Sequence, residues 1–215
     1  MGYTPVKYRG IIFDLDGVIV STDRYHYLAW KRIADKLNIP FGPDDNNRLR
    51  GVSRMESLEI ILDLGHRVIT LNEKQQLAEE KNNLYRDMLN GLSPQFLEPE
   101  VVQTLSVLRE RGIKIAIGSS SKNAKFILEK IGLLNSFDAI SDGTNISKTK
   151  PDPEVFLKAS AMLNMQNRDI LVVEDSVSGI NAAVSGGFDS AGIGDAFGTP
   201  NATYHIRTFS ELLLL

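Results

Sequence analysis

The sequence predicts a doubly wound α/β protein, a parallel sheet covered by helices on both faces, with a helical cap inserted into it. Short apolar runs alternate with amphipathic helical patterns over most of the 215 residues. From about Asp23 to Met88, by contrast, the pattern is helical throughout and contains no convincing strand. We therefore expect residues 1–22 and 89–215 to form the α/β core and residues 23–88 to form the cap.

Six apolar runs of strand length lie in the predicted core. Strands of a parallel sheet are buried on both faces and are therefore almost continuously apolar. The expected strands are Gly10–Phe13, Ile113–Ile117, Ala139–Ser141, Ile170–Val173, Ser190–Ile193 and Tyr204–Ile206. The expected core helices lie between them, at Glu100–Glu110, Asn123–Ile131, Pro153–Leu163 and Gly179–Ser185.

The predicted cap contains four helical segments, at Tyr25–Leu37, Asp44–Leu49, Ser53–Leu64 and Glu73–Met88. The chain would return to the core through residues 90–94, Asn-Gly-Leu-Ser-Pro, which are rich in breakers of regular structure. The last residues, Leu212–Leu215, are expected to form either a short docking helix begun at Ser210 or a truncated end.

Composition limits the chemistry that the chain can perform. The formal net charge of −3 gives no support for a nucleic-acid partner, because such proteins usually carry a basic excess. The absence of cysteine excludes disulfides and thiolate ligands or nucleophiles. A metal would therefore be held by oxygen atoms or by the three histidines, and carboxylates would favour Mg²⁺.

Nothing in the sequence indicates a membrane partner. Met1 to Gly10 is polar and lacks the apolar core of a signal peptide, and no apolar run approaches the length of a transmembrane helix. We therefore expect a cytoplasmic protein. It is expected to be a monomer.

Two carboxylates directly follow the first predicted strand. Ile11-Ile12-Phe13 runs into Asp14-Leu15-Asp16-Gly17, and residues i and i+2 of an extended chain point the same way. Two like charges in one small volume repel, so one of them is protonated unless a cation lies between them. The pair therefore indicates an acid/base pair or an oxygen-ligand metal site. The alternative is a solvated, Asp-rich turn in which Gly17 relieves strain.

The second predicted strand ends in the small polar run Gly118-Ser119-Ser120-Ser121-Lys122-Asn123, followed by a helix. Gly118 would permit close approach of the backbone, and hydroxyls beside a helix N-terminus suit a phosphate group. The alternative is an ordinary serine N-cap of the next helix.

Two more polar segments accompany later strands. Lys148-Thr149-Lys150-Pro151 offers a cation, and the proline biases Lys150 toward an extended conformation; alone, this segment would be a surface loop. Ile170–Val173 runs into Glu174-Asp175-Ser176, a second acidic pair, with Gly179 near the start of the next helix. Asp-Ser before a helix is also an ordinary cap.

These four segments occur in order at one end of successive strands, where open parallel sheets bind their ligands. Together they offer carboxylates for a divalent cation, hydroxyls and amides for a phosphate, and a lysine to neutralise charge. Phosphoryl transfer needs this combination. The constellation therefore favours catalysis over the structural alternatives.

The ordered motifs Asp-Leu-Asp-Gly-Val, Ser-Ser, Lys-Pro and Glu-Asp-Ser resemble those of the haloacid dehalogenase (HAD) superfamily of aspartyl-phosphate phosphotransferases, over essentially the whole chain. The resemblance implies a Rossmann-like core in which Asp14 is the nucleophile and Asp16 the general acid/base. Ser119 would bind the transferring phosphate, and Lys150 would offset its charge. Mg²⁺ would be held by Asp14, the backbone carbonyl of Asp16, Asp175 and Glu174, the last either nearby or coordinating.

The cap resembles that of the β-phosphoglucomutase family within this superfamily, in Tyr25–Trp30, Arg50–Ser57 and Glu80–Tyr85. A mutase must hold a sugar bisphosphate in either orientation, so it needs a second, non-reacting phosphate site. Arg54 suits that role because a guanidinium binds phosphate oxygens in a bidentate manner. The resemblance implies substrate contacts from Trp30, Gly51, Val52, Ser53, Arg54, Ser57, Lys81, Asn82, Ser120, Ser121, Lys122 and Asn123.

Three cap residues keep structural alternatives. His26 and Trp30 are four apart and share one helix face; the resemblance has His26 assist Asp16 and places Trp30 against the sugar or the cap hinge. The alternatives are a satisfied interdomain histidine and a packed core aromatic. For Lys81 the alternative is a solvated helix face.

The resemblance implies interconversion of β-D-glucose 1-phosphate and D-glucose 6-phosphate, with Mg²⁺ as the metal and β-glucose 1,6-bisphosphate as the phosphoryl primer. The binding partners would be small sugar phosphates. Two alternatives stay open: a sugar-phosphate phosphatase that uses the same carboxylates with water as acceptor, and a non-catalytic phosphosugar-binding protein.

Overall fold

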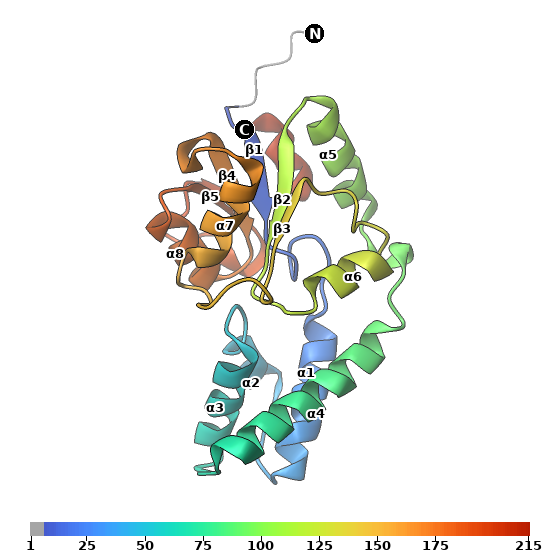
Figure 1. Cartoon of the computed structure of the whole chain (residues 1–215), viewed down its shortest axis with the longest axis vertical. Helices are drawn as coiled ribbons and strands as arrows, with labels where there is room; N and C mark the ends of the chain where they lie inside the picture. The colour runs from blue at the N-terminus through green and yellow to red at the C-terminus, as the bar shows by residue number, and fades with distance from the viewer. Residues whose placement is uncertain (1–6) are drawn as a thin grey trace. The chain divides into compact units, whose positions relative to one another are not determined.

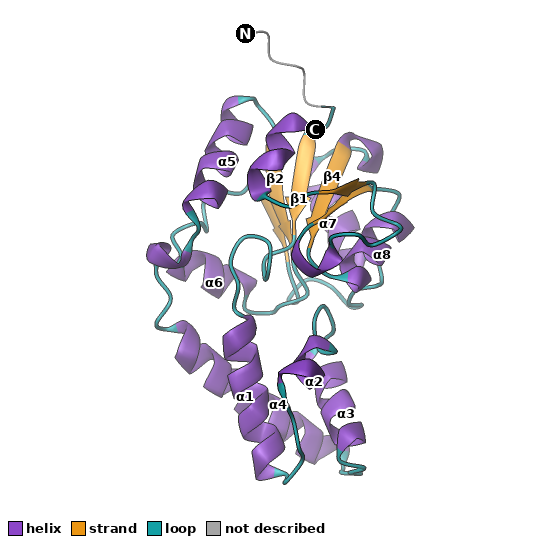
Figure 2. Ribbon diagram, turned by 180° about the vertical axis from the view of Figure 1, so that it is seen from behind, coloured by secondary structure: helices purple, strands orange, loops and turns teal. Residues whose placement is uncertain are grey.

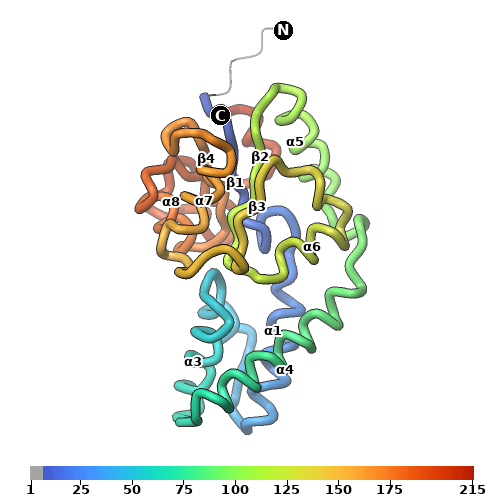
Figure 3. The backbone as a smooth tube through the Cα atoms, viewed as in Figure 1, coloured from blue at the N-terminus to red at the C-terminus, as the bar shows by residue number. Residues whose placement is uncertain are grey.

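A computed structural model describes residues 7–215, which divide into two compact units. The first comprises residues up to Ser21 together with Ser93–Leu215, and the second comprises Thr22–Leu92. Figure 3 follows the chain out of the first unit after β1 and back into it before α5. The assignment of residues 23–88 to a cap domain stays a prediction. The predicted absence of a signal segment rests partly on residues 1–6, which lie outside the described residues.

The first unit contains one six-stranded parallel sheet in the order β3-β2-β1-β4-β5-β6 (Figure 2). The strands are β1 Gly10–Phe13, β2 Lys114–Gly118, β3 Ala139–Ser141, β4 Ile170–Glu174, β5 Asp189–Gly192 and β6 Tyr204–His205. Ile12 of β1 pairs with Ala116 on one side and with Val172 on the other. The strand order reverses between β1 and β4, where doubly wound sheets bind ligands.

Helices cover both faces of this sheet, as Figure 1 shows, which confirms the predicted doubly wound fold. On one face, Ile12 packs with Phe156 and Phe188 beside α7 and α8. The next residue, Phe13, faces the other side and stacks on Phe209 at a centroid distance of 5.4 Å. The core helices are α5 Pro99–Glu110, α6 Ala124–Lys130, α7 Glu154–Leu163 and α8 Val177–Ser185, with short 3₁₀ turns at Pro94–Phe96, Asn167–Asp169, Gly194–Ala196 and Phe209–Leu214.

The C-terminal residues form the docking helix that was one of the two expectations for them. A 3₁₀ helix at Phe209–Leu214 buries Phe209 and Leu212. Two hydrogen bonds attach this helix to α5 and its C-terminal end. The Ser210 backbone N–H donates to Glu100 at 3.0 Å, and Arg111 donates to the Leu213 carbonyl at 2.8 Å. This helix therefore closes the face of the sheet on which Phe13 lies.

The second unit is helical, with α1 Asp23–Lys36, α2 Pro43–Asn47, α3 Arg54–Leu64 and α4 Leu71–Leu89. Its own apolar core gathers Trp30, Ile33, Leu58 and Ile61. Capping boxes start two of the helices, Ser53 with Glu56 for α3 and Thr70 with Glu73 for α4. Throughout residues 7–215, the helices lack the length and apolar character that crossing a bilayer requires.

Gly118 tests the packing of the sheet. A Cβ on Gly118 would lie 2.6 Å from Phe156 Cδ1 and 2.9 Å from Ile12 Cγ2. Gly118→Ala should therefore lower the free energy of unfolding by about 1–3 kcal/mol, since overpacking forces neighbours off their rotamers. Urea unfolding of the full chain measures the change. The control is Gly91→Ala, where the added atom has no neighbour nearer than 3.5 Å; equal stability losses in the two variants would contradict the packing account.

Candidate active site

Asp14 extends β1 into the region where the strand order reverses. Its backbone N–H donates to the Val173 carbonyl at 2.9 Å, and the residue is only 7% exposed. The chain then turns through Gly17, whose φ is +89°. A Cβ on Gly17 would lie 1.9 Å from Asp175 Oδ2, so the glycine admits the carboxylate of Asp175 against the backbone. The solvated-turn alternative is therefore wrong for Asp14, because its side chain is buried.

Lys150 joins the two acidic segments. Its ammonium contacts Asp14 Oδ1 at 2.5 Å and also forms an ion pair with Glu174 Oε1. The side chain of Lys150 is 2% exposed, and that of Glu174 is 1% exposed. The surface-loop alternative for Lys150 is wrong. A buried charge is stable only when it is paired and hydrogen-bonded, and these partners satisfy that condition.

Glu174 is fixed from both sides. Its Oε1 faces Lys150, while its Oε2 accepts hydrogen bonds from the backbone N–H and the hydroxyl of Ser176, both at 2.8 Å. The first turn of α8 leaves room for this carboxylate only because Gly179 lacks a Cβ, which would lie 1.9 Å from Glu174 Oε1. Ser176 also caps α8 by accepting from the Gly179 backbone N–H. The ordinary cap and the acidic cluster are thus built from the same residues.

Burial and mutual repulsion raise the pKa values of two of these acids. Burial, reinforced by the charges of Glu174 and Asp16, raises the pKa of Asp14 to about 7 although Lys150 opposes the shift. Burial and the charges of Glu174, Asp14 and Asp16 raise the pKa of Asp175 to about 8. Burial opposes the charge of Lys150, but Asp14 and Glu174 outweigh it and raise the pKa of that ammonium. Lys150 stays charged, and the surrounding acids exceed it in number.

The donors of this cluster fit a divalent cation. Carboxylate and carbonyl oxygens are the ligands that Mg²⁺ prefers. Burial and the neighbouring acids keep the pKa of Asp175 raised even though the charge of Lys150 opposes the shift, so an added cation would stabilise the ionised carboxylates. Within residues 7–215, no three acidic or histidine side chains already converge as metal ligands. The metal roles of Asp14, Asp16, Glu174 and Asp175 therefore stay predictions that the chemistry of the donors supports.

The Ser119–Asn123 segment follows β2 as a tight loop. The Ser119 backbone N–H donates to the Ser141 carbonyl at 3.0 Å, and the Ser119 hydroxyl accepts from the Ser121 backbone N–H at 3.2 Å. Among the described residues, the buried Ser120 hydroxyl has no hydrogen-bond partner. Asn123 is buried, and Lys122 is exposed.

Two interpretations of this segment are corrected. Gly118 does not serve close approach of a ligand, because the space of its missing Cβ is filled by Phe156 and Ile12. The serine N-cap alternative is wrong for α6, since Asn123 is the residue at the cap position and makes no side-chain capping bond. Ser121 instead accepts the Asn123 backbone N–H at 3.1 Å.

Sequence reasoning missed Asp142, which follows β3 as Asp14 follows β1. It is 1% exposed; its Oδ1 accepts from the Thr144 backbone N–H at 2.9 Å. Its buried Oδ2 has no hydrogen-bond partner among the described residues. A Cβ on Gly143 would lie 2.4 Å from the Ser120 carbonyl oxygen, so this turn packs directly on the Ser119–Asn123 segment. An acid directly after a strand was the available signal, but β3 has only three residues.

In the helical unit, Lys81 is buried rather than solvated, so the alternative of a solvated face is wrong. It is 2% exposed, and its ammonium lies 2.7 Å from His26 Nδ1. The same ammonium lies over the rings of Trp30 and Tyr85, at 4.9 Å and 4.6 Å from their centroids. Burial, together with the charges of Lys81 and Arg54, holds the pKa of His26 well below its usual value. A neutral imidazole can accept the Lys81 hydrogen bond.

Trp30 belongs to the apolar core of this unit, as the packed-aromatic alternative expected, and it also contacts Lys81. Thr22 and Tyr85, which sequence reasoning missed, share a buried hydrogen bond of 2.8 Å between their hydroxyls. Tyr85 also lies 4.1 Å from the His26 ring. The predicted residues His26, Trp30 and Lys81 are therefore brought together by direct contact.

Arg54 begins α3 and donates to Asn82 Oδ1 at 2.7 Å. Burial lowers the pKa of its guanidinium, which is held partly away from water. Ser53 caps α3 by accepting from the Glu56 backbone N–H at 3.3 Å, and Ser57 is buried in the same helix. Gly51 and Val52 lie half-buried just before them, with Gly51 at a φ of +76°. Arg54 and Asn82 are thus brought together, whereas the Ser53 hydroxyl serves the helix.

Comparisons with known proteins agree with this geometry. Residues 8–187 match the sequence profile of the haloacid dehalogenase-like hydrolases. The chain is 43% identical over 208 residues to the β-phosphoglucomutase of Bacillus subtilis, covering 96% of this chain and 92% of that protein. It is 30% identical to the phosphorylated carbohydrates phosphatase of Thermotoga maritima, covering 84% and 82%.

A solved structure of a β-phosphoglucomutase from Clostridium difficile superposes with a TM-score of 0.90 at 35% identity, covering 95% of this chain and 93% of that one. The chain therefore belongs to the haloacid dehalogenase-like hydrolase family. The predicted family membership is confirmed.

The raised pKa values predict how Mg²⁺ stabilises the protein as pH changes. Because Asp14 and Asp175 bind protons more tightly when folded, their contribution to stability is complete below a pH of about 4 and is lost as pH rises through their folded pKa values of about 7 and about 8. Mg²⁺ competes with those protons, so its effect should grow over the same range.

Thermal unfolding with Mg²⁺ and with EDTA, from about pH 5 to about pH 8.5, measures this effect. The melting temperature in EDTA should fall as pH rises, and the gain from Mg²⁺ should widen. Asp175→Asn is the control and should flatten the dependence. A gain from Mg²⁺ that is the same at every pH would contradict the assignment of these acids to the cation.

Proposed function

We propose that this protein is a β-phosphoglucomutase that interconverts β-D-glucose 1-phosphate and D-glucose 6-phosphate. The observation that carries the proposal is the buried ion pair of Lys150 with Asp14 and Glu174, at the point where ligands bind in such sheets. Similarity to β-phosphoglucomutases over nearly the full chain supports the choice of reaction. The substrate would be a small sugar phosphate, and β-glucose 1,6-bisphosphate would prime the enzyme.

In the proposed reaction, phosphorylated Asp14 gives its phosphoryl group to the free hydroxyl of the sugar monophosphate. The Asp14 O–P bond breaks, a bond from the sugar oxygen to phosphorus forms, and Asp16 takes the hydroxyl proton. The bisphosphate then turns round. Its other phosphoryl group passes back to the Asp14 carboxylate, while the proton on Asp16 returns to the departing sugar oxygen.

Each core residue has a stated physical task in this scheme. Lys150 favours the ionised form of Asp14, opposing the effect of burial, and would offset the charge of the phosphoryl group. The Ser119 hydroxyl would donate to a phosphoryl oxygen. Mg²⁺, held by Asp14, the Asp16 carbonyl, Glu174 and Asp175, would neutralise negative charge that Lys150 alone does not balance.

The helical unit would supply recognition of the sugar and of its non-reacting phosphate. Arg54 would bind that phosphate, with Asn82 holding the guanidinium in place. Ser121, Lys122 and Asn123 would complete the distal site from the core. His26 would assist Asp16, and burial together with the charge of Lys81 holds the pKa of its imidazole low. Lys81 would contact the sugar.

A sugar-phosphate phosphatase is the second candidate. The Thermotoga maritima relative supports it, because that protein is a phosphorylated carbohydrates phosphatase that is 30% identical to this chain. The two candidates use the same nucleophile and differ only in whether a sugar hydroxyl or water accepts the phosphoryl group from Asp14.

Incubation with β-glucose 1-phosphate, Mg²⁺ and a trace of β-glucose 1,6-bisphosphate separates the two candidates. We expect glucose 6-phosphate, followed by a coupled assay, to account for the substrate consumed. Asp14→Asn should lower kcat at least about a thousandfold, because the amide is a poor nucleophile, while leaving the fold intact. Release of inorganic phosphate that matches substrate loss, without glucose 6-phosphate, would contradict the mutase.

The non-reacting phosphate site is tested at Arg54. Arg54→Ala should lower kcat/KM for glucose 1-phosphate by about ten- to a hundredfold, since a charged hydrogen bond to phosphate is lost. Arg54→Lys should recover part of the lost kcat/KM, because a lysine keeps the positive charge but cannot form the bidentate hydrogen bonds of a guanidinium. The control is the exposed Arg48→Ala in the same unit. Unchanged kcat/KM in Arg54→Ala would mean that no distal phosphate site is used.

A further inference from the structure

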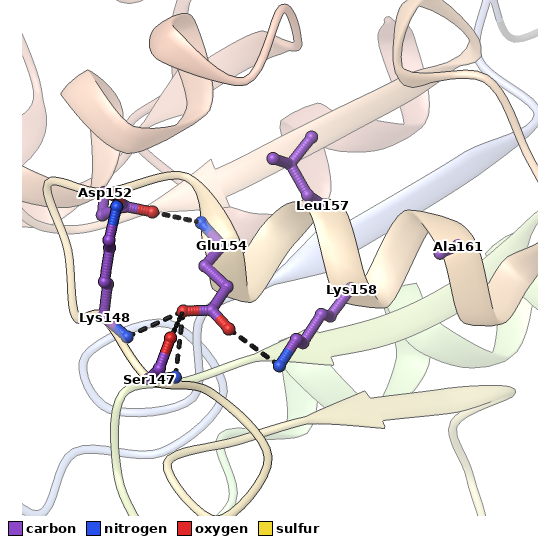
Figure 4. A pocket seen from close by; sticks show the side chains of 7 residues that line it. All are labelled: Ser147, Lys148, Asp152, Glu154, Leu157, Lys158 and Ala161. Atoms are coloured by element: carbon purple, nitrogen blue, oxygen red, sulfur yellow. Dashed lines mark hydrogen bonds and ion pairs between the residues drawn. The ribbon is translucent and has the colours of Figure 1, made fainter.

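The segment between β3 and α7 carries Lys150, and a group of polar side chains fastens it to the start of α7. Figure 4 shows this group around a pocket lined by Ser147, Lys148, Asp152, Glu154, Leu157, Lys158 and Ala161. The pocket contains none of the residues assigned above to catalysis or binding. Four of its side chains, Ser147, Lys148, Asp152 and Glu154, nevertheless lie within four positions of Lys150 in the chain.

Glu154 makes most of these contacts. Its Oε2 accepts three hydrogen bonds, from the Ser147 backbone N–H at 2.9 Å, the Ser147 hydroxyl at 2.8 Å and the Lys148 backbone N–H at 2.7 Å. Its Oε1 pairs with Lys158 one turn along the helix at 2.7 Å. One carboxylate thus holds the backbone two and three residues before Lys150 against the first turn of α7.

Lys158 extends the attachment toward β3, because its ammonium also donates to the Asn145 carbonyl. The Asn145 side chain accepts from the Asp142 backbone N–H at 3.1 Å, which closes the turn that follows β3. The segment from Asp142 to Lys148 is therefore tied to α7 at two points and folded back on itself at its start.

The polar side chains that line this pocket bind one another and fix the segment in place, so we interpret the group as a structural brace and not as a ligand site. Every polar side chain that Figure 4 labels already has a partner within the group: Ser147 and Lys158 pair with Glu154, and Lys148 pairs with Asp152 at 3.3 Å. A binding site would present unpaired groups to its ligand. Here the polar groups pair with one another and with the backbone of the segment.

Both ends of the braced segment reach the candidate active site. Lys150 lies two residues beyond its end at Lys148 and contacts Asp14 and Glu174. At the other end, the Gly143 backbone N–H donates to the Ser121 carbonyl at 3.2 Å. The segment is therefore a rigid connection that both the lysine and the Ser119–Asn123 loop depend on.

We propose that Glu154 is a positioning residue for phosphoryl transfer, which holds Lys150 at Asp14 by fixing the segment that carries it. The inference rests on the proposed function for its assay. Glu154 touches none of the reacting groups; it acts through the backbone of Ser147 and Lys148. Positioning of this kind matters because small displacements of a catalytic group cost large factors in rate.

The charge of Glu154 is secure under ordinary assay conditions. The bond from Lys158, followed by those from Ser147 and Lys148, lowers the pKa of Glu154 to about 2. The carboxylate therefore stays ionised across the pH range in which the enzyme would be measured. A neutral glutamine at this position would keep one acceptor oxygen but would lose the pairing with Lys158.

Steady-state kinetics of Glu154→Ala and Glu154→Gln test the proposal. Glu154→Ala should lower kcat about tenfold or more and change KM less than about threefold, because the reacting groups are displaced while the sugar contacts remain. Glu154→Gln should give an intermediate kcat. Two matched controls on α5 should keep kcat. Glu110→Ala removes an exposed glutamate. Val101→Ala removes two buried methyl groups, so it lowers stability through lost apolar packing and leaves the Lys150 segment untouched.

All variants are assayed below their own melting temperatures. A kcat for Glu154→Ala within about twofold of the parent protein would overturn the proposal, as would an equal loss in Val101→Ala. If Glu154→Ala does not fold, Glu154→Gln decides by the same criterion. Total phosphoryl transfer is recorded, as glucose 6-phosphate plus inorganic phosphate. A parent protein that only releases phosphate would therefore contradict the mutase and still leave the role of Glu154 measurable.

Discussion

The arrangement of the α/β unit depends on one buried cation, the ammonium of Lys150 between Asp14 and Glu174. Two carboxylates at the ends of adjacent strands would repel in a site that water barely reaches, and burial alone already raises the pKa of Asp14. Lys150 offsets that repulsion by pairing with both carboxylates. The lysine comes from a segment remote in sequence, so its position depends on the fold and on the brace at Glu154.

Small residues make this concentration of charge possible. Gly17 and Gly179 leave space for the carboxylates of Asp175 and Glu174, and any larger residue would place a Cβ on top of them. Gly143 similarly lets the turn after β3 pack on the Ser119–Asn123 loop. The site therefore requires these glycines as much as its acidic residues. Its geometry follows from close backbone packing at the carboxyl edge of the sheet.

Much of this was predictable from the sequence. The apolar runs located all six strands to within one residue at each end, because buried parallel strands have a distinctive composition. Contacts between distant residues were not predictable. The neighbour of Gly118 is Phe156, and the partner of Lys81 is His26, so neither the packing role of the glycine nor the burial of the lysine could be found locally. The start of α4 was predicted late, although Thr70 and Glu73 form a recognisable capping box.

The proposed chemistry depends on Asp14 becoming phosphorylated. Mass spectrometry of the acid-quenched protein, after brief reaction with β-glucose 1,6-bisphosphate and Mg²⁺, locates the phosphoryl group directly. We predict a single phosphoryl group on the peptide that contains Asp14, labile to hydroxylamine as an acyl phosphate must be, and absent from Asp14→Asn. A phosphoryl group on another residue, or turnover without any phosphorylated protein, would contradict the assignment of Asp14 as the nucleophile.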